Sequence, residues 1–270
     1  MATRAKKFHS EADRPTPKTR QPKMQVPVEF DDNRQTSEKH QPQQTNSLKL
    51  KLDHLKTFEP LTDNQKLFFD AYKNQEYFIM LSGSAGVGKS FIALYKALEE
   101  VMDKSNPFKK VIIVRSAVQG RDLGFTPGSV EEKMSLYEQP YHQICETLFG
   151  RKDAYQRLCE QDCIEFVSTS FLRGCTFDDA IVVVDECQSM TFHELSSIVT
   201  RVGYRSKIIF CGDTKQNDLI KNKHDVSGLS SFLKIAETMH EFHRIHFTPD
   251  DICRSSLVKS WIIACEKFDD

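Results

Sequence analysis

The chain has 270 residues, of which 39% are hydrophobic and 28% are charged, and its formal net charge at pH 7 is −1. That length and apolar content suit one ordinary domain with a substantial core. The near-neutral charge does not predict nucleic-acid binding, so any such surface has to be local. Eight cysteines without a C-x-x-C pair, and the lack of any signal-like or membrane-spanning apolar run, favour a cytoplasmic protein with no membrane partner.

The first 47 residues differ in composition from the rest. They hold five prolines and many Gln, Thr, Lys and Arg residues, and no helical or alternating period persists. Such a composition is typical of a segment that forms no core, so we expect a disordered, mildly basic tail over residues 1–47 and a folded domain over residues 48–270. The tail's charges can attract nucleic acid, although solvated charge is their usual state.

After the tail, short runs rich in Val, Ile and Phe alternate with stretches of helical composition. The runs are nearly uninterrupted, as expected of strands buried on both faces. A segment at 240–246 also reads as a strand, which sends His243 and His246 to opposite faces and argues against a metal site there. The other predicted elements are helices at 63–74, 88–102, 130–149, 190–202, 228–238 and 254–267, and strands at 77–82, 111–115, 163–168, 181–185 and 207–212.

Alternation of strands and helices predicts an α/β domain in which helices cover a parallel sheet. The last helix is expected to pack Leu257, Trp261 and Ile262 inward. A long polar loop at 116–128 lies after a strand, at a carboxyl end of the sheet, and is a candidate binding element. Four cysteines in apolar surroundings are expected in the core, namely Cys145, Cys163, Cys187 and Cys211.

Residues 83–90 read Gly-Ser-Ala-Gly-Val-Gly-Lys-Ser and match the phosphate-binding pattern G-x-x-x-x-G-K-[ST] at every fixed position. A predicted strand precedes them and a predicted helix follows, so a bound anion would meet the positive end of a helix. The pattern predicts a nucleoside triphosphate with Mg²⁺: Lys89 reaches the terminal phosphates and Ser90 offers its hydroxyl to the metal. The expected nucleotide-binding residues here are Gly83, Ser84, Ala85, Gly86, Val87, Gly88, Lys89, Ser90 and Phe91.

The strand at 181–185 ends in two carboxylates, Asp185 and Glu186. Carboxylates at the end of an apolar strand are costly to bury without a cation, so Asp185 is expected to hold Mg²⁺ together with Ser90. Glu186 can polarise a water towards the γ-phosphate. The long separation from Lys89 favours the P-loop branch that carries an inserted strand and a catalytic glutamate.

Further polar residues lie beside these motifs. Asp213 ends the next apolar strand and Gln216 follows it, and together they can sense the γ-phosphate and its attacking water, although Asp213 would also suit a simple cap. Thr62 is expected to cap the first helix. Gln65 can hydrogen-bond an adenine edge. An arginine, Arg254 or Arg173, can clamp transferring phosphate from the same chain or a neighbour.

The motifs occur in an order that resembles the PhoH family, a group of P-loop ATPases related to the RecA-like domain of superfamily-one helicases. The resemblance covers about residues 58–267, and three departures from its usual pattern, at Ser116, Cys175 and 255–256, suggest a phage-type member. The matching segments are Thr62-x-x-Gln65, 83–90, 114–118, 123–128, 171–177, 184–188, 200–203, Gly212-Asp213-x-x-Gln216-x-Asp218, 227–229 and Ile252-Cys253-Arg254-x-x-Leu257-Val258.

The resemblance implies Mg²⁺-dependent ATP hydrolysis on a single RecA-like P-loop NTPase domain, coupled to single-stranded RNA or DNA. We place the nucleic-acid face on the loop after the second strand, with Arg115, Ser116, Arg121 and Phe125 as candidate contacts. Superfamily-one helicases build their ATP site between two RecA-like domains, so a single domain predicts a homo-oligomer, with a hexameric ring favoured. In such a ring Arg254 or Arg201 would reach the neighbouring subunit.

Two other readings stay open. The chain can be an ATP-gated scaffold that switches shape with little turnover, although Glu186 disfavours this because a pure switch has less use for a water-activating acid. Phosphoryl transfer to a small metabolite is less favoured still, because no arginine-rich lid segment is evident.

Overall fold

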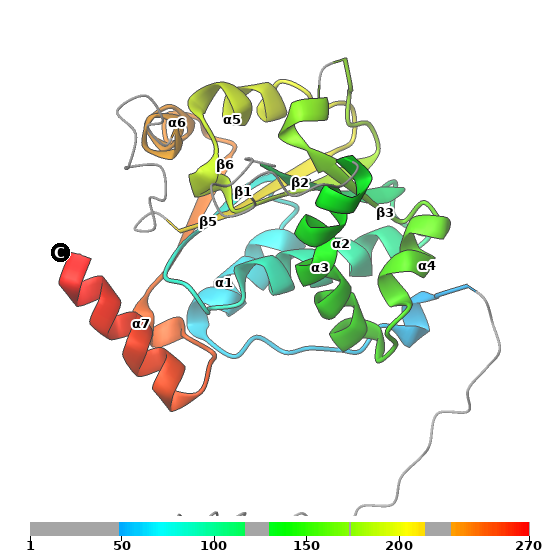
Figure 1. The fold of residues 1–270 in the computed structure, drawn as a ribbon. Coiled ribbons are helices and arrows are strands. Elements are labelled where there is room, and N and C mark those ends of the chain that lie inside the picture. The colour runs from blue at the N-terminus through cyan, green and yellow to red at the C-terminus, as the bar shows by residue number, and fades with distance from the viewer. Residues whose placement is uncertain (1–48, 117–129, 173, 214–227, 270) are drawn as a thin grey trace, which may run out of the picture. The chain divides into compact units, whose positions relative to one another are not determined.

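The computed structural model describes residues 49–116, 130–172, 174–213 and 228–269 (Figure 1). The predicted tail at 1–47 lies outside the described residues. So does nearly all of the predicted binding loop, which contains the candidate residues Arg121 and Phe125. Two further candidates, Arg173 and Gln216, also lie outside the described residues.

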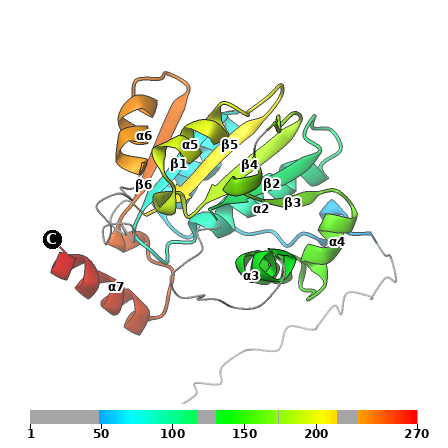
Figure 2. The same ribbon diagram turned by 45° about the horizontal axis from the view of Figure 1, so that its top comes forward.

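A parallel sheet forms the centre of the domain, with the strand order β3-β2-β4-β5-β1-β6 (Figure 2). The predicted parallel α/β fold is confirmed. Strand β5 lies between β1 and β4, so it is the inserted strand that the spacing of the motifs predicts, and the fold is RecA-like. The strands are β1 (Phe78–Gly83), β2 (Lys110–Arg115), β3 (Ile164–Ser168), β4 (Ala180–Asp185), β5 (Lys207–Gly212) and β6 (Phe242–Phe247).

Helices cover both faces of the sheet (Figure 1). One face carries α1 (Asp63–Lys73), α2 (Lys89–Met102), α3 (Val130–Phe149) and α4 (Ala154–Glu160), and the other carries α5 (Phe192–Val199) and α6 (Leu229–Ala236). The six helices predicted from the sequence are confirmed to within a few residues at their ends. Helix α4 was not predicted, because seven residues are too short to display a helical period.

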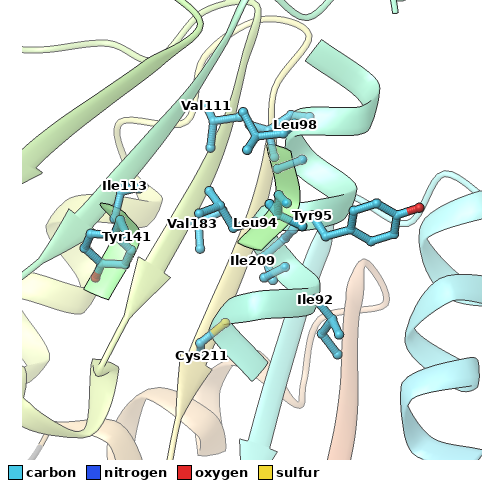
Figure 3. Close-up of a cluster of buried hydrophobic side chains, with 14 of the residues drawn as sticks. Ile92, Leu94, Tyr95, Leu98, Val111, Ile113, Tyr141, Val183, Ile209 and Cys211 are labelled. Atoms are coloured by element: carbon cyan, nitrogen blue, oxygen red, sulfur yellow. The ribbon is translucent and has the colours of Figure 1, made fainter. Parts of the chain in front are cut away.

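Alternating residues of the strands pack into two separate cores, one on each face of the sheet, because successive side chains of a strand point to opposite faces. Ile79 and Leu81 belong to the core cluster that contains residues of α2, whereas Phe78 and Met80 belong to the cluster that contains residues of α5 and α6. Figure 3 shows part of the first cluster, with Leu94 and Leu98 beside Val183. The prediction of burial on both faces holds for β1, β4 and β5 throughout. It is wrong for the edge strand β3, where Glu165 is exposed.

Helix α7 (Ser256–Asp269) stands apart from the sheet in both views (Figures 1 and 2). Its Ile262 packs against the core as predicted. The prediction is wrong for Leu257 and Trp261, which are 78% and 70% exposed. The helix has apolar residues on two sides, and only one side can face the domain.

The core cysteines follow the prediction at three of four positions, since Cys145, Cys187 and Cys211 are buried and Cys163 is half-buried. Within the described residues, no helix is both long enough and apolar enough to cross a bilayer.

Candidate nucleotide-binding site

The phosphate-binding loop runs from the end of β1 to the start of α2, as the sequence predicts. All three of its glycines adopt a positive φ, and two of them also make close contacts. Gly83 has φ +117°, and a Cβ there would lie 1.9 Å from the carbonyl oxygen of Phe247 on β6. Gly86 has φ +73°, and a Cβ there would lie 3.2 Å from side-chain carbons of both Arg254 and Ile262. The loop is therefore packed against the segment that leads into α7.

Lys89 is the first residue of α2, and its ammonium group folds into the loop. Nζ donates to the carbonyl oxygens of Gly83 and Ser84, at 2.8 and 2.7 Å. Burial lowers the pKa of Lys89, and the carboxylate of Asp213 opposes that shift most strongly. A cation at the positive end of a helix is arranged to bind phosphate.

The two predicted metal-holding residues meet directly. Ser90 Oγ donates to Asp185 Oδ1 at 2.6 Å, although 95 residues separate the two in sequence. The other carboxylate oxygen, Oδ2, accepts a hydrogen bond of 2.9 Å from the hydroxyl of Tyr141 on α3. A hydroxyl and a carboxylate side by side form a donor set of the hard oxygen type that Mg²⁺ prefers. These residues therefore fit a magnesium ion.

Glu186 follows in the left-handed region, at φ +52°, which is strained for a residue with a side chain. Its Oε2 accepts a hydrogen bond of 2.5 Å from Gln188 Nε2. The same amide uses its Oε1 to accept from the backbone N–H of Asp213, at 3.1 Å. Gln188 thus links the predicted water-activating glutamate, just after β4, to the predicted phosphate sensor just after β5.

The lysine, the serine and the strand-end acids line a cavity of about 520 Å³. Its walls come from the phosphate-binding loop, the carboxyl ends of three strands, one face of α3 and the segment before α7. The lining residues are Ala85, Gly86, Gly88, Lys89, Ser90, Phe91, Arg115, Pro140, Gln143, Ile144, Thr147, Asp185, Glu186, Cys211, Gly212, Asp213 and Arg254. The structure brings the predicted loop and the strand-end acids together here, whereas the sequence gives no sign that α3 forms a wall.

Gln65 lies beneath the loop rather than in the cavity lining. It is 4% exposed, and its Nε2 donates to the carbonyl oxygen of Val87 at 3.0 Å while its Oε1 accepts from the backbone N–H of Leu61 at 2.8 Å. The amide that was expected to read adenine is therefore engaged within the protein. Thr62 caps α1, as predicted, by accepting from the backbone N–H of Gln65.

The candidate arginines lie at opposite ends of the strands. Arg254 lines the cavity of its own chain. Arg201 follows α5 on the side of the sheet where β4 begins, and its Nη1 donates to the carbonyl oxygen of Cys175 at 3.3 Å. Of the two candidate arginines that the structure describes, Arg254 is the one that lines the cavity of its own chain.

Two of the candidate nucleic-acid residues are described. Arg115 ends β2 and lines the cavity, with its guanidinium 5.7 Å from the ring centre of Tyr137. Ser116 is buried, and its Oγ donates to Glu194 Oε1 at 3.3 Å. Neither placement favours direct contact with a nucleic-acid strand.

The model of a known family, described as "PhoH-like protein", matches residues 57–266. The chain belongs to the PhoH-like family. A PhoH-like protein of Bacillus subtilis (strain 168) is 33% identical over 213 residues, which cover 78% of this chain and 65% of that one. Protein PhoH of Escherichia coli (strain K12) is 32% identical over 66% of this chain and 50% of that one. This PhoH-like chain therefore spans about half to two thirds of the length of these relatives.

Among solved structures, unliganded Pif1 from Bacteroides sp. matches with a TM-score of 0.35 and 16% identity, covering 73% of this chain and 43% of that one. The SWI2/SNF2 ATPase core of Sulfolobus solfataricus matches with a TM-score of 0.37 and 13% identity, over 72% and 47% of the two chains. Family membership together with the geometry of the loop makes the domain a P-loop NTPase of the PhoH-like type.

Proposed function

We propose that this PhoH-like domain binds ATP with Mg²⁺ and hydrolyses it. The observation that carries the proposal is the contact of Ser90 with Asp185 in the same cavity that Lys89 and Glu186 line. A phosphate-binding loop alone would suit a binding protein. A loop together with a metal-holding pair and a further carboxylate suits phosphoryl transfer to water.

Each side chain has a role in this proposal. Lys89 and the loop N–H groups bind and neutralise phosphate oxygens, and Ser90 and Asp185 hold Mg²⁺, which supplies further charge neutralisation when it is bound. Glu186 takes a proton from the attacking water. Asp213, and Gln216 outside the described residues, respond to the γ-phosphate. Arg254 stabilises the transferring phosphoryl group in its own chain, which its place in the cavity lining supports.

The test is ATP hydrolysis with Mg²⁺, comparing the wild type with Glu186→Gln. Loss of a general base typically costs about 10²- to 10⁴-fold in rate. We expect a loss of this size in kcat with nucleotide binding retained. Glu165→Gln is the matched control, because Glu165 pairs with Lys110 on the surface of β3 and does not line the cavity. Nucleotide binding without turnover in the wild type would favour the ATP-gated scaffold instead.

We further propose that hydrolysis is coupled to single-stranded RNA or DNA. The support is the site's position at the carboxyl ends of the strands, where ligands of open α/β sheets bind, with Arg115 at the end of β2 in the cavity lining. Measuring the same turnover with and without single-stranded RNA and DNA tests the coupling. Stimulation by either strand supports it, and a rate that neither strand changes contradicts it.

We also propose that the chain assembles with copies of itself, with a hexameric ring as the favoured form. The support is α7, whose outer side exposes four large apolar residues: Leu257, Val258, Trp261 and Phe268. Exposed apolar residues gathered on one helix often mark a protein interface. A copy docked there would lie next to the nucleotide site, because Arg254 lines the cavity and α7 begins two residues later. Arg201, which lies on the side of the sheet where β4 begins, stays the candidate for reaching a neighbouring subunit.

A further inference from the structure

The carboxylate of Asp185 is held from two sides. Its Oδ1 accepts from Ser90 Oγ at 2.6 Å, and its Oδ2 accepts from the Tyr141 hydroxyl at 2.9 Å. Asp185 is itself buried at the end of β4. A carboxylate with hydrogen-bond partners on both oxygens cannot rotate freely about its last side-chain bond.

Tyr141 is well placed to fix that orientation. It is 1% exposed, and its ring lies 5.8 Å from the ring centre of Phe166 on β3, in the hydrophobic cluster that also holds Ile113 (Figure 3). Packing on this scale leaves the ring a single orientation. Its hydroxyl therefore approaches Asp185 from a fixed point on α3.

The hydroxyl can serve only as a donor towards this carboxylate. An ionised carboxylate can only accept hydrogen bonds, so the phenol supplies the proton of the 2.9 Å contact with Oδ2. With Oδ2 occupied in this way, Oδ1 is the oxygen left beside Ser90.

We propose that Tyr141 is a positioning residue for the metal-holding carboxylate, acting through Asp185 so that Oδ1 and the Ser90 hydroxyl face a shared magnesium ion. This inference rests on the proposed function of the site. It assigns to α3 a part in metal binding, as well as in walling the cavity. Partners that orient metal ligands are known to matter, since their loss typically costs about 10- to 100-fold in metal affinity or activity.

A merely structural role would give a different result. If Tyr141 only satisfied a buried carboxylate, its loss would lower the stability of the protein and leave the metal affinity of the folded protein unchanged. Metal affinity is therefore the readout to use, and it can be measured without hydrolysis.

The experiment titrates Mn²⁺, as a spectroscopic substitute for Mg²⁺, into the full chain with bound ADP and follows free Mn²⁺ by electron paramagnetic resonance. Tyr141→Phe removes the hydroxyl and keeps the ring. We expect a dissociation constant for Mn²⁺ about 10- to 100-fold higher than that of the wild type. ADP affinity without metal is expected to stay the same, because the phosphate-binding loop is untouched.

Tyr155→Phe is the matched control, because Tyr155 is buried in the same hydrophobic cluster, on α4, and does not line the cavity. It should leave the Mn²⁺ affinity unchanged. Thermal melting of each variant reports stability, and the titration is run well below the melting range, where each variant is folded. A Tyr141→Phe protein with wild-type Mn²⁺ affinity would overturn the inference, whether or not it is less stable. A wild type that binds Mn²⁺ with ADP but never hydrolyses ATP would contradict the proposed function alone.

Discussion

Gln188 joins two residues that the proposed reaction needs. Its amide donates to Glu186 and accepts from the backbone of Asp213, so one buried side chain ties the end of β4 to the end of β5. A Cβ at Gly212 would lie 3.0 Å from the amide oxygen of Gln188. The lack of a side chain at Gly212 therefore leaves space for the side chain of Gln188. The amide therefore holds a backbone-strained glutamate in one orientation.

Replacement of this amide should act on turnover rather than on binding. In Gln188→Ala the Glu186 carboxylate loses the partner that orients it, and a small misplacement of a reacting group can cost about 10²-fold in rate. We expect kcat to fall by that order, with KM for ATP little changed, because the phosphate-binding loop is not altered. Steady-state kinetics measure both quantities.

Gln156→Ala controls for loss of an amide, since Gln156 pairs with Glu160 on the surface of α4. Unchanged kcat in Gln188→Ala would refute the orienting role. A parallel loss of ATP affinity would instead assign Gln188 to maintaining the shape of the loop.

At the scale of elements, a buried ion pair connects α2 to β5. Lys207 Nζ donates to both oxygens of Glu100, at 2.9 and 2.8 Å, and lies 4.3 Å from the ring centre of Tyr72 on α1. Burial lowers the pKa of Lys207, an effect that Glu100 opposes. The pair sits near the C-terminal end of α2, whose N-terminal end carries the phosphate-binding loop.

Breaking this pair should cost stability, whereas replacing both partners should not. Lys207→Met leaves the Glu100 carboxylate buried without a counter-charge, and we expect a loss of about 3–5 kcal/mol in the free energy of unfolding. The double variant Lys207→Met/Glu100→Leu is expected to recover most of that loss, because no buried charge remains. Urea denaturation measures both. Equal losses in the single and double variants would show that packing, and not charge, decides stability here.

Much of the fold was predictable because its signals are local. The runs at 181–185 and 207–212 are continuous in Val, Ile and Phe, and they form β4 and β5 as predicted. The phosphate-binding loop was equally clear, since eight consecutive residues carry it. The burial of residues in the edge strand β3 was harder to predict, because an edge strand is less fully covered and residues such as Glu165 stay in solvent.

The rest of the site arises from contacts between distant segments. The sequence predicts a helix over 130–149, but nothing local to Tyr141 identifies Asp185, 44 residues away, as its partner. Gln65 shows the opposite case. Its amide is suited to hydrogen-bond adenine, but in the fold it donates to the carbonyl oxygen of Val87. A sequence gives the capacity of a side chain for hydrogen bonds, and tertiary packing decides which bonds are made.

At the scale of the whole molecule, the outer side of α7 remains the feature that the domain alone does not explain. Leu257, Trp261 and Phe268 recur at spacings that place them on one side of a helix, and Phe268 is 91% exposed. Large exposed aromatic residues are common anchors of protein interfaces. If a second copy covers them, removing the anchor should both dissociate the assembly and disturb the adjacent site.

The test is the variant Trp261→Asp, studied by light scattering with nucleotide present. We expect the wild type to assemble and Trp261→Asp to be monomeric, because a charge at the centre of an apolar contact is not compensated. Its ATP turnover should fall with assembly, while nucleotide binding is retained, since Trp261 does not line the cavity. Leu67→Asp, at an exposed apolar position on α1, is the matched control and should assemble as the wild type does. A wild type that is monomeric with nucleotide bound would count against self-association altogether, and an assembled Trp261→Asp protein would move the interface away from α7.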